Sequence, residues 1–115
     1  MSITIDLSYL QTITRGDKAF EKTLLTGSIA DIDTKMQAIQ IAWQNKDAAG
    51  VRQYAHSLVS LCAIAGMPEL EKLTRSLDQL FVDRVFHGDQ EALYQSVLTG
   101  WQSGKEQLQT IVSTY

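Results

Sequence analysis

Apolar residues recur every three or four positions along almost the whole chain, and this period constrains the fold more than any other feature. A helix has about 3.6 residues per turn, so such spacing places the apolar side chains on one face. The chain contains a single proline, Pro68, and no strand–turn–strand pattern. The pattern therefore predicts an all-α protein.

Short polar or glycine-containing breaks divide the chain into five predicted helices. The breaks are Arg15–Asp17, Asn45–Asp47, Gly66–Pro68 and Phe86–Asp89. Aspartates are favoured caps of helix N-termini, so Asp6, Asp17, Asp47 and Asp89 are the expected caps, and Pro68 suits the first turn of a helix. Four sizeable amphipathic helices with short connections predict an antiparallel, up-down-up-down four-helix bundle with a short extra N-terminal helix. At 115 residues, positions 1–115 form one domain.

The apolar stripes of the four long helices predict the core. They include Phe20, Leu25, Ile32, Met36, Ile39, Trp43, Val51, Ala55, Leu58, Cys62, Leu70, Leu77, Phe81, Val85, Leu93, Val97, Trp101 and Leu108. The two tryptophans are expected to anchor this core, and Cys62 is expected to be a small buried apolar residue.

Composition excludes several classes of protein. The net charge of −3 gives no basic footprint for nucleic acid or for an anionic membrane. One cysteine allows no internal disulfide, and no apolar run reaches the roughly 20 residues that cross a bilayer. The first residues lack the basic and apolar regions of a signal peptide. We therefore expect a cytoplasmic protein.

His56 does not belong to a core stripe. It lies two positions before Leu58, and at about 100° per residue this offset turns the imidazole away from the core. Its neighbours on the outward face are Arg52, Gln53, Val59, Ser60 and Ala63. These side chains are mostly small or apolar, so the face resembles a docking surface around an accessible imidazole.

Other interpretations of this face remain open. His56 can be an ordinary surface histidine, or the face can pack under the short first helix. A metal site is disfavoured because His87 lies in a distant loop, and no nucleophile elbow supports a hydrolase. His87 is expected to be a solvated loop residue. Solvated helix faces are expected for Asp31, Asp33, Asp78 and Asp83.

The stretch from Ala55 to Gly66 resembles the signature of histidine-containing phosphotransfer (HPt) domains. The matching positions are Ala55, His56, Leu58, Ser60 and Gly66. The resemblance covers nearly the whole chain. Two positions depart from the signature, because Val59 replaces the usual lysine and Leu61 replaces the usual serine.

This resemblance implies that His56 accepts a phosphoryl group from a receiver-domain aspartate and passes it to another receiver domain. It places Ser60 beside the phosphoryl group. Arg52 and Gln53, one turn before His56, are expected to lie near that group as well, and our hypothesis is that Arg52 partly substitutes for the missing lysine. The resemblance also places Val59 and Ala63 in the docking surface.

The implied partners are the receiver domain of a response regulator, a hybrid sensor histidine kinase, or both. Mg²⁺ is expected on the receiver, with no cofactor on this chain and no nucleic-acid or membrane partner. The chain would act as a monomer, consumed and regenerated as an intermediate instead of working as a true enzyme. Two alternatives stay open: a degenerate module that binds a kinase or receiver without being phosphorylated, and an unrelated helical adaptor.

Overall fold

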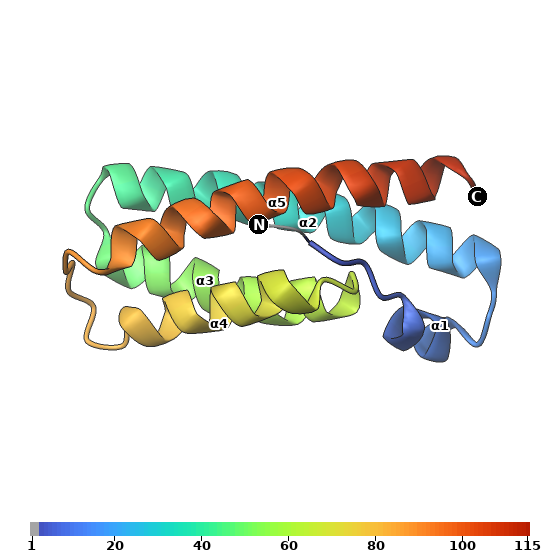
Figure 1. Ribbon diagram of the computed structural model, residues 1–115, viewed down its shortest axis with the longest axis horizontal. Helices are drawn as coiled ribbons and strands as arrows, with labels where there is room; N and C mark the ends of the chain where they lie inside the picture. The colour runs from blue at the N-terminus through green and yellow to red at the C-terminus, as the bar shows by residue number, and fades with distance from the viewer. Residues whose placement is uncertain (1–2) are drawn as a thin grey trace.

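The computed structural model describes residues 3–115, and within them it contains five α-helices and no strand (Figure 1). The helices are α1 (Ser8–Thr14), α2 (Lys18–Gln44), α3 (Ala48–Ile64), α4 (Pro68–Leu80) and α5 (Gln90–Ser113). The prediction of an all-α fold with a short N-terminal helix is confirmed.

Helices α2 to α5 form the bundle. Helix α3 packs against α2 and α4, and α5 packs against the same two helices on the other side, so neighbours in sequence are antiparallel neighbours in space. The pair α2 and α5, with 27 and 24 residues, extends beyond the shorter pair α3 and α4, with 17 and 13 residues. Helix α1 lies beyond the end of the α3–α4 hairpin, beside this extension (Figure 1).

The turn between α3 and α4 fixes the level at which these two helices meet. Gly66 has a φ of 76°, in the left-handed region that glycine adopts without steric cost. A side chain here would also collide with the backbone of Asp6, whose N–H donates to the Gly66 carbonyl at 2.8 Å. The turn is therefore tight, and it holds the N-terminal segment against the end of the hairpin.

Two of the predicted aspartate caps are confirmed. Asp17 accepts a hydrogen bond from the N–H of Phe20 at 3.1 Å, and Asp47 accepts one from the N–H of Gly50 at 3.0 Å. Asp6 accepts a hydrogen bond from the N–H of Ser8, the first residue of α1, but the N-cap position of this helix is occupied by Leu7.

The predicted cap at Asp89 is wrong. Asp89 precedes α5 but accepts no capping hydrogen bond. The α4–α5 turn is instead closed by the fully buried Gln90, whose Nε2 donates to the carbonyls of Leu80 and Val85 at 2.8 and 2.9 Å. Its Oε1 accepts from the N–H of His87 at 2.6 Å. A long amide side chain satisfies three backbone groups that one aspartate does not reach.

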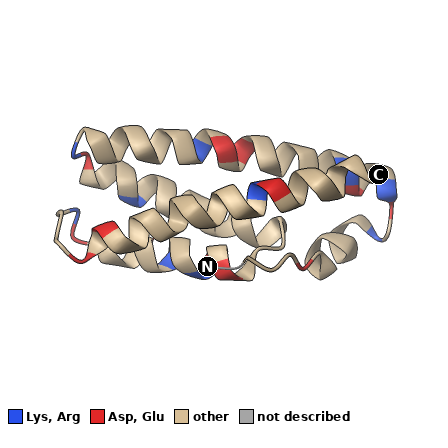
Figure 2. Ribbon diagram, turned by 45° about the horizontal axis from the view of Figure 1, so that its top comes forward, with Lys and Arg blue, Asp and Glu red and all other residues tan. Residues whose placement is uncertain are grey.

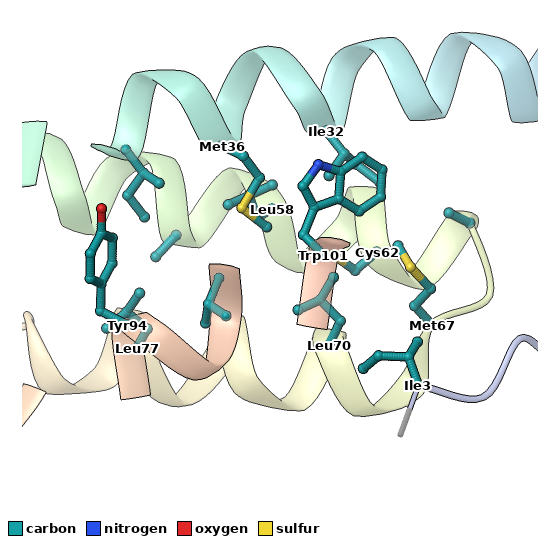
Figure 3. Packing of buried hydrophobic residues seen from close by; sticks show 14 of the residues in the cluster. Ile3, Ile32, Met36, Leu58, Cys62, Met67, Leu70, Leu77, Tyr94 and Trp101 are labelled. Atoms are coloured by element: carbon teal, nitrogen blue, oxygen red, sulfur yellow. The ribbon is translucent and has the colours of Figure 1, made fainter. Parts of the chain in front are cut away.

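The core follows the predicted stripes with two exceptions. Figure 3 shows Met36, Leu58, Leu70, Leu77 and Trp101 converging between the helices. Cys62 is fully buried, and burial raises the pKa of its thiol to about 12. Phe20 and Val85 are exposed, because Phe20 lies in the first turn of the projecting end of α2 and α4 ends at Leu80, before Val85.

Trp101 is buried, and Trp43 is half-buried and stacks on Tyr94 with ring centroids 4.0 Å apart. Both tryptophans therefore anchor the bundle as expected. No helix within residues 3–115 combines the length and the hydropathy needed to cross a bilayer. Charged residues of both signs are interspersed along the helices, without a long run of one sign (Figure 2).

Candidate functional site

His56 lies in the middle of α3 and points out of the bundle. Its side chain is 79% exposed, while Ala55 and Leu58 beside it in the sequence are fully buried. The outward orientation predicted from the helical period is confirmed. Helix α1 does not cover the imidazole, so the interpretation in which this face packs under the first helix is wrong for His56.

The imidazole is held by a carboxylate from the next helix. His56 Nδ1 lies 3.1 Å from Oδ2 of Asp78 on α4. The expectation that Asp78 belongs to a solvated helix face is wrong, since its side chain is only 17% exposed. The reason is the symmetry of the hairpin: His56 lies 11 residues before Met67 and Asp78 lies 11 residues after it. Equal rise along two antiparallel helices brings the two residues to the same level.

Arg52 balances the charge of this carboxylate. Its Nε lies 3.4 Å from Oδ1 of Asp78, and its side chain is 33% exposed. The contact is an ion pair without an aligned hydrogen bond, because the buried Oδ1 has no hydrogen-bond donor within residues 3–115. Much of the positive charge of Arg52 is therefore directed at Asp78.

The pairing with Asp78 assigns the proton on the imidazole. An ionised carboxylate only accepts hydrogen bonds, so Nδ1 carries the hydrogen and donates it. In the neutral ring the other nitrogen, Nε2, then keeps its lone pair. The site thus presents an exposed, oriented imidazole nitrogen that is able to act as a nucleophile.

Two surface depressions flank His56. The first, here called the Arg84 depression, is lined by His56 together with Ala49, Arg52, Gln53, Ser57 and Arg84. The second, the Arg75 depression, is lined by His56 together with Val59, Ser60, Arg75 and Asp78. The structure therefore brings Arg52 and Gln53 to one side of the imidazole, and Val59 and Ser60 to the other.

Ala63 lies apart from both depressions. It is half-buried and lines a separate surface hollow with Asp6, Ser8 and Tyr9, next to α1. The side chain of Tyr9 is exposed there. Of the predicted neighbours of His56, Ala63 is thus the one that the first helix approaches.

Sequence reasoning missed three residues of this site. Asp78 and Arg75 carry a signal in the sequence, because counting outward from Met67 places Asp78 opposite His56 and Arg75 opposite Val59. Arg84 carries no such signal. It lies in the irregular turn after α4, where no helical period predicts which way a side chain points.

The remaining acidic and histidine candidates have local partners. His87 is exposed as predicted, and its Nε2 lies 2.8 Å from Asp83 Oδ2, which raises the pKa of His87 and lowers the pKa of Asp83. Asp31 is exposed as predicted, whereas Asp33 is half-buried and accepts hydrogen bonds from α5. In the part of the chain described, no three histidine, cysteine or acidic side chains gather as metal ligands.

Comparisons with known proteins agree with this geometry. The family model of the Hpt domain matches residues 23–113. The histidine-containing phosphotransfer protein B of Pseudomonas aeruginosa is similar in structure, with a TM-score of 0.85 at 17% identity over 96% of both chains.

The HPT domain of a sensor hybrid histidine kinase from Shewanella is similar with a TM-score of 0.83 at 14% identity, over 96% of this chain and 95% of that one. At these identities the two structures establish the shared fold. A search by sequence found no match among curated proteins.

Proposed function

The chain belongs to the Hpt domain family, and we propose that it is a phosphorelay intermediate that carries a phosphoryl group on His56. His56 receives the group from the aspartyl phosphate of one receiver domain and gives it to the aspartate of another. The observation that carries this proposal is an imidazole that is 79% exposed and oriented by Asp78 through Nδ1.

In the proposed transfer, the lone pair of Nε2 attacks the phosphorus of the aspartyl phosphate. A bond forms between Nε2 and phosphorus, and the P–O bond to the receiver aspartate breaks, so the electron pair leaves with that carboxylate. Nδ1 keeps its hydrogen, and the phosphorylated ring carries a positive charge that Asp78 stabilises. The second transfer reverses these steps with a new aspartate as the nucleophile.

The division of work between the partners follows from what each side chain offers. Phosphoryl transfer depends mainly on positioning and on stabilisation of charge. His56 and Asp78 supply a rigid, oriented nucleophile, and the proposal assigns Mg²⁺ and the acidic residues that hold it to the receiver. The chain then acts as a reactant that is regenerated, without a cofactor of its own.

The neighbours of His56 are proposed to tune this transfer. Ser60 and Gln53, which line one flanking depression each, are the proposed hydrogen-bond donors to the phosphoryl group. Val59 supplies no charge where the resembling signature has lysine. Because Arg52 already faces Asp78, it replaces that lysine only in part. We therefore expect transfer that is slow but measurable.

The proposed docking surface is the outer face of α3 around His56. Val59 and Ala63 are its apolar members on α3, and both are half-buried. The partner we propose is a receiver domain, carried either by a response regulator or by a hybrid sensor histidine kinase. We propose that the chain works in the cytoplasm. We also propose that it acts as a monomer, because a second copy bound to this face would cover His56.

The experiment that tests the proposal follows the phosphoryl group directly. The protein is incubated with a phosphorylated receiver domain, and label that is labile in acid and stable in alkali is measured on the wild type and on His56→Gln. Label on the wild type and none on the variant is the expected result. His87→Gln is the matched control, since His87 also pairs with a carboxylate but lies in the α4–α5 turn, and it should label normally. Equal labelling of the His56→Gln protein would contradict the proposal.

One alternative function has a specific observation in its favour. The uncharged Val59 beside His56 suits a module that binds a kinase or receiver without being phosphorylated. In that case, the receiver binds in a pull-down or calorimetric titration, no label appears, and His56→Gln binds as tightly as the wild type. The labelling experiment and the binding measurement together separate the two functions.

A further inference from the structure

Arg84 reaches the immediate surroundings of His56 from outside the helices that build the site. It lies in the turn after α4, yet it lines the same depression as His56, Arg52 and Gln53. The sequence separates Arg84 from His56 by 28 positions. Helix α3 itself offers no cation beside His56 that is free of an ion pair, because Arg52 faces Asp78. The fold brings the guanidinium of Arg84 to this place instead.

The direction of helical side chains favours this side of His56. Side chains on an α-helix lean toward the helix N-terminus, so a residue covers the surface over the preceding turn. For His56 that turn contains Arg52 and Gln53, which line the Arg84 depression. The opposite depression contains Val59 and Arg75, and the guanidinium of Arg75 is bound to Glu71 at 3.0 Å.

Of the three arginines that line the depressions beside His56, Arg84 is the one whose charge is available for a ligand. Arg52 faces Asp78 and Arg75 faces Glu71, whereas Arg84 is exposed and has no ion-pair partner among residues 3–115. The carboxylate next to it, Asp83, is occupied by the N–H of Val85 at 3.1 Å and by His87 at 2.8 Å.

The turn that carries Arg84 is well defined. The N–H of Arg84 donates to the carbonyl of Phe81 at 2.9 Å, and buried Gln90 binds the carbonyls of Leu80 and Val85 on either side of Arg84. These bonds fix the backbone from which the guanidinium extends. A charge held on an ordered backbone costs less entropy to position than one on a mobile loop.

We propose that Arg84 binds the phosphoryl oxygens of phosphorylated His56. It thereby supplies the phosphoryl group with a positive charge that the uncharged Val59 does not provide. The proposal rests on the function proposed above. A guanidinium suits this task, because its planar N–H groups contact two oxygens of a phosphoryl group at once. Arg84 is thereby a group that touches the transferred phosphoryl, while Arg52 acts through Asp78.

The backbone at Arg84 allows an unusually clean variant. Its φ of 57° lies in the left-handed region, so Arg84→Gly removes the guanidinium without imposing backbone strain. Arg15 has a φ of 53° and is also exposed, but it lies after α1 and lines neither depression beside His56. Arg15→Gly therefore makes the same change of charge and of backbone at a distance from the site.

The test uses a small donor, phosphoramidate, so that receiver docking does not enter the result. Its P–N bond breaks, ammonia leaves with a proton from water, and Nε2 takes the phosphoryl group. We expect Arg84→Gly to slow phosphorylation of His56 about tenfold, below the 10²–10³ seen for donors in water-excluded sites. Arg15→Gly should keep the wild-type rate, and Arg84→Lys should recover part of it.

A second readout reports contact with the phosphoryl group itself. The ³¹P resonance of phosphorylated His56 should move in Arg84→Gly and stay in place in Arg15→Gly, with both variants as stable to urea as the wild type or more so. A rate and a ³¹P shift unchanged in Arg84→Gly overturn the inference and leave the phosphorelay function standing. Equal slowing in both glycine variants also overturns it. Absence of label on wild-type His56, from phosphoramidate and from a phosphorylated receiver, overturns the proposed function and the inference together.

Discussion

Two carboxylates join neighbouring helices of this bundle, and they are used differently. Asp33 on α2 accepts hydrogen bonds from Trp101 Nε1 at 3.1 Å and from Lys105 Nζ at 3.0 Å, both on α5. Asp78 on α4 accepts one from His56 on α3. Both side chains are partly buried, and both connect residues far apart in the sequence. Each carboxylate therefore fixes the register of one helix against another.

The two carboxylates differ in whether their partners retain a reactive atom after the hydrogen bond has formed. An indole N–H and an ammonium group only donate, so nothing reactive remains once Asp33 has bound them. An imidazole has a second nitrogen, so binding to Asp78 orients the ring and leaves Nε2 in solvent. The same cross-helix contact thus stabilises the fold on the α2–α5 side and positions a nucleophile on the α3–α4 side.

The largest effect is expected from Asp78→Ala. Loss of the acceptor frees both the tautomer and the rotation of the ring, and loss of the charge leaves the phosphorylated imidazole without stabilisation. We expect phosphorylation of His56 to slow about 100-fold, less than the roughly 10⁴-fold known for a buried catalytic dyad. The measurements are the labelling rate and the ¹⁵N shifts of the His56 ring, which report the tautomer.

Asp78→Asn sharpens this prediction. Its carboxamide loses the charge and also has an NH2 group that donates to Nδ1, which would put the ring hydrogen on Nε2, so the rate should fall about as far as in Asp78→Ala and the ¹⁵N shifts should report the changed tautomer. If Asp78→Ala labels at the wild-type rate, Asp78 serves only to fix the helices, as Asp33 does.

Asp33→Ala should show the opposite pattern. It leaves the part-buried indole N–H of Trp101 without its acceptor, which costs about 1–3 kcal/mol of the free energy of unfolding. The rate of His56 phosphorylation in the folded fraction should not change, because Asp33 lies on the far pair of helices. The free energy of unfolding is measured by urea titration with tryptophan fluorescence as the signal. A slowed rate at full folding would show that the two sides of the bundle are coupled.

The comparison also shows what the sequence allows to be predicted. The helical period predicts the five helices, most of the core and the exposure of His56, because each depends on residues that are close in the chain. The partners of Asp33 and Asp78 depend on how helices meet, and both residues look like solvated positions on their own helix. For Asp78 the symmetric hairpin around Met67 supplies the missing rule.

Turns set the limit of prediction in this chain. The capping aspartates before α2 and α3 are found from the residue type alone, whereas the turn after α4 is closed by the side chain of Gln90. Its conformation, and therefore the place of Arg84, follows from three hydrogen bonds between the Gln90 side chain and backbone groups 3, 5 and 10 positions earlier, which the helical period does not predict. The extent of α4 and the exposure of Val85 were mispredicted for the same reason.

Arg52→Ala probes the link between the nucleophile and its carboxylate. Without the guanidinium, Asp78 loses its counter-charge and the site loses one cation. We expect transfer to slow by about threefold, which corresponds to the free energy of one part-exposed ion pair. The control is Lys35→Ala on α2, which removes an equal charge away from His56 and should leave the rate unchanged. Equal rates in the two variants would remove Arg52 from the site.

The smallest effect is the pH dependence of the Asp33 contact. Hydrogen bonds from Trp101 and then from Lys105 lower the pKa of Asp33 below its ordinary value of 3.8. A lowered pKa in the folded state means that the unfolded state binds the proton more readily, so the stabilisation is complete above pH 3.8 and is lost as the pH falls through the folded-state pKa.

The difference in unfolding free energy between the wild type and Asp33→Asn isolates this contribution. It should be constant near neutral pH and should shrink below about pH 4, where the unfolded carboxyl begins to take up its proton. A difference that stays flat down to pH 2 would mean that the Asp33 contacts do not depend on its charge. Asp33, which joins α2 and α5, would then act without its charge, whereas Asp78, which joins α3 and α4, would act through it. The two carboxylates would differ in this respect as well as in their partners.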